Sequence, residues 1–70
     1  MEKDDRARLQ ILLDHWIEHN REHAEEFLEW AERAKGLGQA AVHDEIVQAA
    51  QRIGKANESL SAALKQLEEE

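Results

Sequence analysis

Apolar residues recur at helical spacing in two long stretches of the chain. Between residues 4 and 35, and again between 39 and 67, they return every three or four positions, which is typical of amphipathic helices. The apolar face of the first stretch comprises Leu9, Leu13, Trp16, Ile17, Ala24, Phe27, Ala31 and Ala34. The second stretch has a heptad seam, with steps of four and three, at Val42, Ile46, Ala49, Ile53, Ala56, Leu60, Ala63 and Leu67. No segment alternates with a period of two, so we expect no strand.

A short connection, Gly36-Leu37-Gly38, separates the two helical patterns. We expect Gly36 to adopt the left-handed conformation that ends many helices. Helices joined by so short a link become antiparallel neighbours, which should bring Phe27 beside Ile46 or Ala49. The sequence therefore predicts an all-α fold. It is a single helical-hairpin domain over 1–70, with helices at 4–35 and 39–67 and a loop at 36–38.

Two helices alone form a ridge of contact and do not enclose a core. Leu12, Trp16 and Trp30 widen the apolar face of the first helix to one side, which would leave a large exposed patch on an isolated hairpin. A second copy would cover that patch. We therefore expect a homodimer in which two antiparallel hairpins form a four-helix bundle, or coiled coil, with two-fold symmetry.

Three residues do not suit a plain apolar seam. Asn20 lies at the centre of the first apolar face, and Asn57 lies nearly opposite it at the edge of the second. One interpretation is a buried amide pair that fixes the register of the helices. The other is that Asn20 contacts a metal-bound histidine or ligates a metal itself. Gly54 lowers helix propensity by about 1 kcal/mol relative to alanine, so we expect close backbone approach there, beside Trp16 or His19.

Composition and charge exclude several classes of partner. Sixteen acidic and nine basic residues give a formal net charge of −7, which disfavours nucleic acid and anionic membrane surfaces as partners. No apolar run approaches the roughly 20 residues that span a bilayer, and the first residues do not resemble a signal peptide. Cysteine is absent, so neither a disulfide framework nor a thiolate site is possible. We therefore expect a cytoplasmic location.

Three of the four histidines form a strip on the first helix. His15, His19 and His23 are four residues apart, which stacks them about 6 Å above one another along one side of a helix. Neutral imidazoles at this spacing can share a nickel, zinc or copper ion. Three glutamates follow, each three residues after a histidine, and can ligate or orient the rings; they are Glu18, Glu22 and Glu26.

The strip also has an interpretation without metal binding, because a helix with several histidines is often just a solvated face. His15 and His23 lie about 12 Å apart along the helix, so one strip cannot easily direct all three rings at one ion. A second strip across a two-fold axis would complete the coordination. We exclude His43 from the primary site unless a partner chain brings it near, because it follows the loop and lies well over one turn from His23.

The segment from His15 to His23 reads H-W-x-x-H-x-x-x-H, with Trp16 as its aromatic residue. It resembles the N-terminal motif of the CooJ family, the nickel-binding accessory proteins of carbon monoxide dehydrogenase maturation. The resemblance covers nine residues and implies a small, helical, dimeric protein that binds Ni(II) through His15, His19 and His23. It also supplies the choice of nickel, since imidazoles alone would accept Zn(II) or Cu(II). The histidine-rich C-terminal tail of some CooJ proteins has no counterpart after His43, so we expect no bulk storage.

We compared three classes of function. The favoured one is a dimeric nickel metallochaperone that supplies a nickel enzyme such as carbon monoxide dehydrogenase. The alternative is a structural dimeric adaptor whose surface histidines are incidental. A di-metal enzyme ranks third, because that class uses Glu-x-x-His pairs whereas this chain has the reverse order. Nothing in the sequence resembles a nucleophile beside its base, and we do not expect an enzyme.

Overall fold

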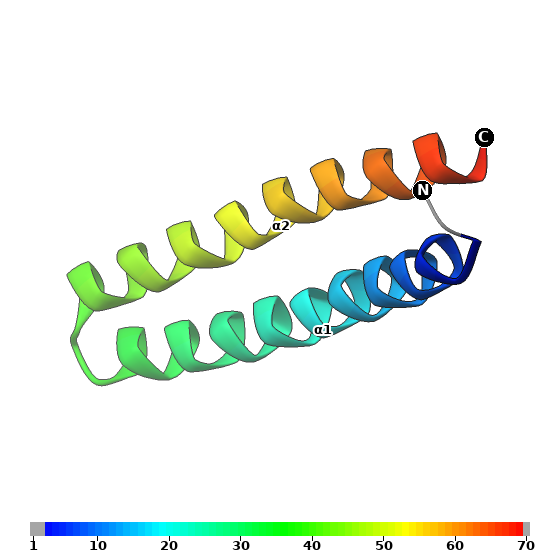
Figure 1. The fold of residues 1–70 in the computed structure, drawn as a ribbon. Coiled ribbons are helices and arrows are strands. Elements are labelled where there is room, and N and C mark those ends of the chain that lie inside the picture. Colours follow the sequence, from blue (N-terminus) through cyan, green and yellow to red (C-terminus); the bar gives the residue numbers. More distant parts are fainter. Residues whose placement is uncertain (1–2, 70) are drawn as a thin grey trace.

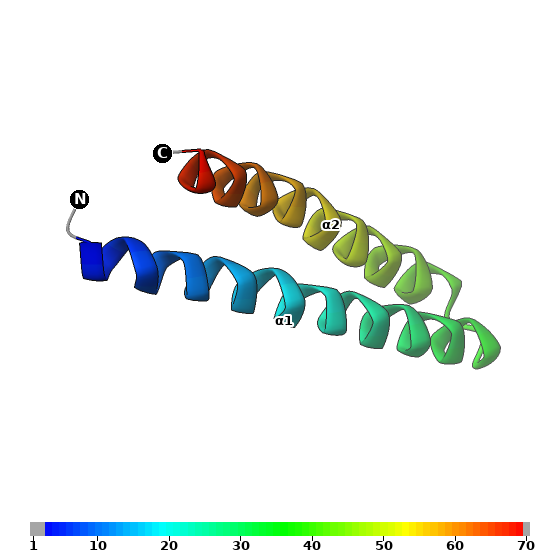
Figure 2. The same cartoon turned by 90° about the vertical axis from the view of Figure 1, so that its right-hand side faces the viewer.

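The chain forms an antiparallel helical hairpin, which confirms the predicted all-α fold. The computed structural model describes residues 3–69; residues 1, 2 and 70 of the expected domain lie outside the described part. Helix α1 spans Lys3–Gly36 and helix α2 spans Ala40–Glu68, each within one residue of its expected bounds. The helices lie side by side, and the start of α1 and the end of α2 lie at the same end of the hairpin (Figures 1 and 2). The molecule measures 52 × 14 × 12 Å.

Helix-forming residues and favourable terminal charges explain the length of α1. Asp4 and Asp5 lie in its first turn, at the positive end of the helix dipole, and Arg33 and Lys35 lie in its last turn, at the negative end. Alanine, leucine, glutamate and arginine, which are among the strongest helix formers, supply most of its interior. None of the described residues forms a strand.

The turn uses a different glycine from the one we expected. Gly36 is the last residue of α1, whereas Gly38 has a φ of 79°, in the left-handed region. The Gly38 N–H donates to the Lys35 carbonyl at 3.0 Å, and the Gln39 N–H donates to the Ala34 carbonyl at 2.9 Å. This is a Schellman motif with glycine just beyond the helix end, where a side chain would be strained. The prediction for Gly36 was therefore wrong by two residues.

The interior seam of α2 also differs from the expected one. The residues that face α1 are His43, Ile46, Ala50, Ile53, Asn57, Leu60, Leu64 and Leu67, while Val42, Ala56 and Ala63 are exposed and Ala49 is half-buried. Both seams are heptads and share four positions, so periodicity alone does not choose between them. The observed seam covers Leu64 in place of Ala63, which removes more apolar area from water, and it brings Asn57 to face α1.

Only four of the described residues are buried: Leu13, Ala31, Ala50 and Leu67. They are spread along the contact between the helices, so no part of the hairpin encloses a core. At the open end, the Arg6 guanidinium donates to the backbone carbonyl of Leu67 at 2.6 Å and thereby satisfies one of the free carbonyls at the end of α2. No helix in the described part of the chain has an apolar stretch long enough to cross a membrane.

Candidate metal centre

Two of the three strip histidines are in direct contact. The Nε2 atoms of His19 and His23 lie 3.1 Å apart, and the ring centroids are 4.4 Å apart. At this distance one ring donates its N–H and the other accepts through a lone pair. Both side chains lie on the exposed flank of α1, one turn apart, as the i and i+4 spacing predicts.

The separation of the two nitrogen atoms suits a shared ligand. Two imidazole nitrogens bound about 2.1 Å from one ion lie about 3.0 Å apart when they occupy neighbouring positions at a right angle. The His19 and His23 nitrogens are already near this spacing. If the bridging proton moves to Nδ1 of its own ring, both Nε2 atoms carry a free lone pair, as a two-point imidazole site requires.

His15 extends the strip without joining this contact. Its ring stacks on that of His19, with centroids 5.6 Å apart and an angle of 21° between the planes. On the other side, the His23 ring lies 6.2 Å from the ring of Phe27, at the border of the apolar seam. Among the described residues, no group of three or more histidine, aspartate or glutamate side chains is arranged to hold an ion. One chain therefore brings together two candidate ligands, and the role of all three histidines stays a prediction.

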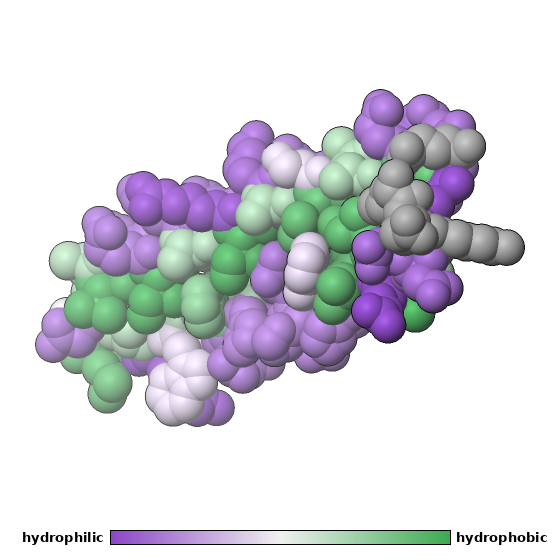
Figure 3. Space-filling model, in the orientation of Figure 1, coloured by the Kyte–Doolittle hydropathy of each residue, from purple (hydrophilic) through white to green (hydrophobic). Residues whose placement is uncertain are grey.

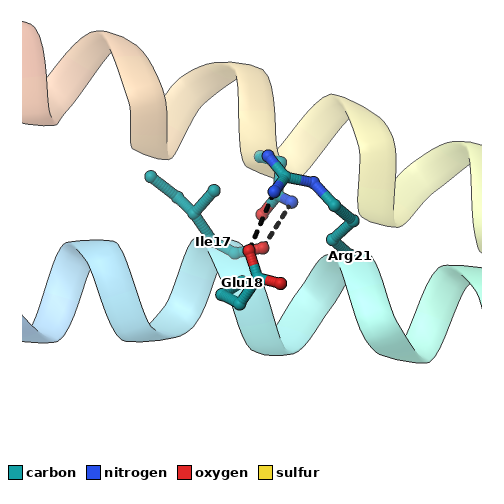
Figure 4. Close-up of polar contacts among 4 residues, drawn as sticks. Ile17, Glu18 and Arg21 are labelled. Carbon is teal, nitrogen blue, oxygen red and sulfur yellow. Dashed lines mark hydrogen bonds and ion pairs between the residues drawn. The ribbon is translucent and has the colours of Figure 1, made fainter.

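The neighbouring carboxylates divide between two roles. Glu26 Oε1 lies 3.9 Å from His23 Nδ1, which is an ion-pair distance and too long for a hydrogen bond. Glu18 is instead paired with Arg21 at 2.8 Å on the solvent side of α1 (Figure 4). Both members of that pair are well exposed, so it contributes little to stability. Of the three glutamates considered, Glu26 is the one with a described contact to the strip.

The two asparagines form the amide pair that the sequence suggested. Asn20 Nδ2 donates to Asn57 Oδ1 at 3.0 Å. Asn57 Nδ2 in turn donates to the backbone carbonyl of Ile17 at 2.9 Å. Both side chains are partly buried between the helices. The register interpretation therefore accounts for the Asn20 amide nitrogen.

His43 and Gly54 lie outside this centre. His43 Nδ1 is 3.0 Å from Asp44 Oδ1 at the start of α2. The Asn20–Asn57 contact puts it level with Ala34, about 16 Å along the axis from His23, so its exclusion from the strip agrees with the fold. The prediction for Gly54 was wrong: a Cβ there would meet nothing within 4 Å. The observed seam passes through Ile53 and Asn57, and Gly54 consequently faces solvent.

An apolar groove near the loop was not recognised from the sequence. It runs between the helices and is lined by Phe27, Trp30, Val42, Ile46 and Ala49, with Glu26 and Glu45 at its edges. This confirms that Phe27 lies near Ile46 and Ala49. In the heptad register that α2 adopts, Val42 points outward and Ala49 is half-buried. The possibility of this register was the feature of the sequence that could have indicated the groove.

Comparison with known proteins identifies a family. Residues 9–67 match a family described as a domain of unknown function (DUF8180). The match includes most of both helices, the loop and all four histidines. A search of curated proteins and a search of solved structures each found no match. Because the match covers well over half of its length, the chain belongs to the DUF8180 family.

Proposed function

We propose that this protein binds Ni(II) through its histidine strip and acts as a cytoplasmic, dimeric metallochaperone that supplies a nickel enzyme such as carbon monoxide dehydrogenase. The observation that carries the proposal is the 3.1 Å separation of the His19 and His23 Nε2 atoms. The nine-residue resemblance to the CooJ motif favours nickel over Zn(II) and Cu(II). Binding and transfer, with no catalysis, are the proposed activity.

The exposed position of the pair suits a carrier. A cargo ion must exchange with a partner, and in the single hairpin His19 is exposed and His23 is only half-buried, so an ion can reach both from solvent. Two imidazoles leave several coordination positions free, since Ni(II) takes four or more ligands in nitrogen and oxygen sites. Those positions can be filled by water, by His15, or by the same pair on a second copy. Glu22 and Glu26, the glutamates of the strip other than Glu18, add negative charge that attracts a divalent cation.

A calorimetric titration of metal-free protein with Ni(II) at pH 7.5 tests this proposal. We expect saturable binding that His19→Ala and His23→Ala each weaken by at least tenfold, because each removes one nitrogen of the pair. His15→Ala should have a smaller effect. His43→Ala is the matched control, since it removes an imidazole about 16 Å away along the helix axis, and should leave the affinity unchanged.

The structural adaptor is the alternative that this series separates. If His19→Ala, His23→Ala and His43→Ala all bind Ni(II) as tightly as the parent, the strip is a solvated face and the proposal fails. Lower pH provides a second readout. Protons compete with metal for imidazole between about pH 8 and 5, so affinity should fall and protons should be released as nickel binds.

A further inference from the structure

One side of the hairpin carries large apolar side chains that are exposed to solvent. On α1, the exposed fractions are 43% for Leu12, 41% for Trp16 and 56% for Trp30. The groove near the loop is lined by Trp30 of α1 and by Val42 and Ala49 of α2. The large exposed side chains of α1 and the strip of α2 that begins with Val42 and Ala49 therefore lie on the same side of the hairpin. We call it the open face. Figure 3 shows hydrophobic residues as a band between the helices that reaches the loop end.

The hairpin exposes more surface than a compact monomer of its mass. Its accessible area is 5533 Å², whereas a compact monomer of 8.1 kDa should expose about 4,500 Å². The hairpin is 52 Å long and only 14 by 12 Å across, so the excess area lies along its sides. A second copy of the same length can cover one of these sides over its whole extent, where a standard stable interface needs about 800 Å² from each partner.

The residues of α1 on the open face are arranged symmetrically. Leu12 and His19 lie nine and two positions before Arg21, and His23 and Trp30 lie two and nine positions after it. At 100° per residue these four side chains fall within about 40° of one another around the helix. Two copies of α1 packed antiparallel at the level of Arg21 would thus place Leu12 against the partner's Trp30, and His19 against the partner's His23.

The strip on α2 has its centre of symmetry at the same level. The Asn20–Asn57 hydrogen bond fixes the alignment of the helices and puts Ala56 level with residue 21. Ala49 and Ala63 lie seven positions before and after Ala56, on the same strip. Two copies of α2 packed antiparallel about Ala56 would bring alanine against alanine, which permits the short end of the usual 8–10 Å range of helix separations.

We propose that a second copy covers the open face with α1 on α1 and α2 on α2, about a two-fold axis that crosses the helices at the level of Arg21 and Ala56. Every helix then lies antiparallel to both neighbours, which aligns opposite ends of the helix dipoles. The relevance of this arrangement to metal binding rests on the proposed function. It gathers the His19–His23 pairs of both chains around one axis, so that one ion can bind four imidazoles.

Disulfide trapping tests this arrangement, because the chain has no cysteine of its own. Ala56→Cys protein, oxidised in the presence of a chelator, should form a symmetric disulfide in most molecules. Ala49→Cys or Ala63→Cys alone should form little, since the two thiols would lie about 21 Å apart along the axis. A mixture of these two variants should cross-link efficiently. Ala62→Cys, on the outer side of α2, is the control and should remain reduced.

The competing arrangements give different products. A two-fold axis parallel to the helices would place α1 on the partner's α2 and keep the two Ala56 positions apart. Absence of the Ala56→Cys cross-link in folded, helical protein therefore overturns the proposal, as does cross-linking of Ala49→Cys with itself. The chelator keeps this result independent of nickel. A trapped dimer that binds no Ni(II) would overturn the metal function while leaving the arrangement intact.

Discussion

Gly54 lies in the middle of α2 with open space around it and no contact that requires the absence of a side chain. Glycine in a helix interior costs about 0.5–1 kcal/mol relative to alanine because it loses more backbone freedom on folding. The close approach expected from the sequence is missing. No structural reason for glycine at this position is evident among the described contacts.

Gly54→Ala should therefore stabilise the protein by about 0.5–1 kcal/mol, which corresponds to roughly 4 °C in Tm for a domain of this size. Thermal unfolding followed by circular dichroism at one protein concentration measures the change. Gly38→Ala is the matched control and should lower Tm, because the φ of 79° at Gly38 strains any other residue. A Gly54→Ala variant less stable than the parent would contradict the open surroundings of Gly54 on which this prediction rests.

The His19–His23 contact shows how far residue-level prediction could go. The spacing of four residues placed both rings on one strip, and that much follows from helical periodicity. Which neighbouring rings meet depends on their rotamers, and helical periodicity does not predict rotamers. His15 and His19 have the same spacing yet stack through their faces, with no ring-nitrogen contact.

At the scale of the helices, periodicity predicted the elements and the hairpin but not the register of the seam. The strips 42, 49, 56, 63 and 43, 50, 57, 64 both complete a heptad with the same four large residues. Leu64 and Asn57 decide between them, since the observed seam covers a leucine and satisfies an amide pair. Such choices depend on contacts across the hairpin, which one helix considered alone does not show.

The amide pair should therefore hold this register. Asn20→Leu removes the donor to Asn57 Oδ1 and leaves that partly buried oxygen without its protein partner, so we expect a loss of about 1 kcal/mol in the free energy of unfolding. Asn20→Leu combined with Asn57→Leu should recover the loss and exceed the parent, because two apolar side chains replace both polar ones. Urea unfolding of the three proteins measures these differences.

Gln51→Leu, at an exposed position of α2, is the control for added apolar surface and should change stability by less than about 0.5 kcal/mol. An Asn20→Leu variant more stable than the parent would contradict the stabilising role of the pair.

On the scale of the whole molecule, the hairpin is long, narrow and almost without a core. Its four buried residues are spread along the contact between the helices. Domains of this size usually need further support from metal, disulfides or association. Disulfides are excluded by composition, and the open face and the histidine pair point to the other two. The proposed dimer and the proposed metal site therefore stabilise the same state, and bound nickel should raise Tm by linkage.

Nickel K-edge X-ray absorption on the Ni(II)-loaded protein shows which residues hold the ion, because scattering from imidazole rings identifies histidine ligands. We expect strong imidazole scattering in the parent and in His43→Ala. We expect loss of that signal, and an oxygen-dominated shell, when His19→Ala and His23→Ala are combined. A spectrum of the combined variant identical to that of the parent would contradict the claim that His19 and His23 hold the ion.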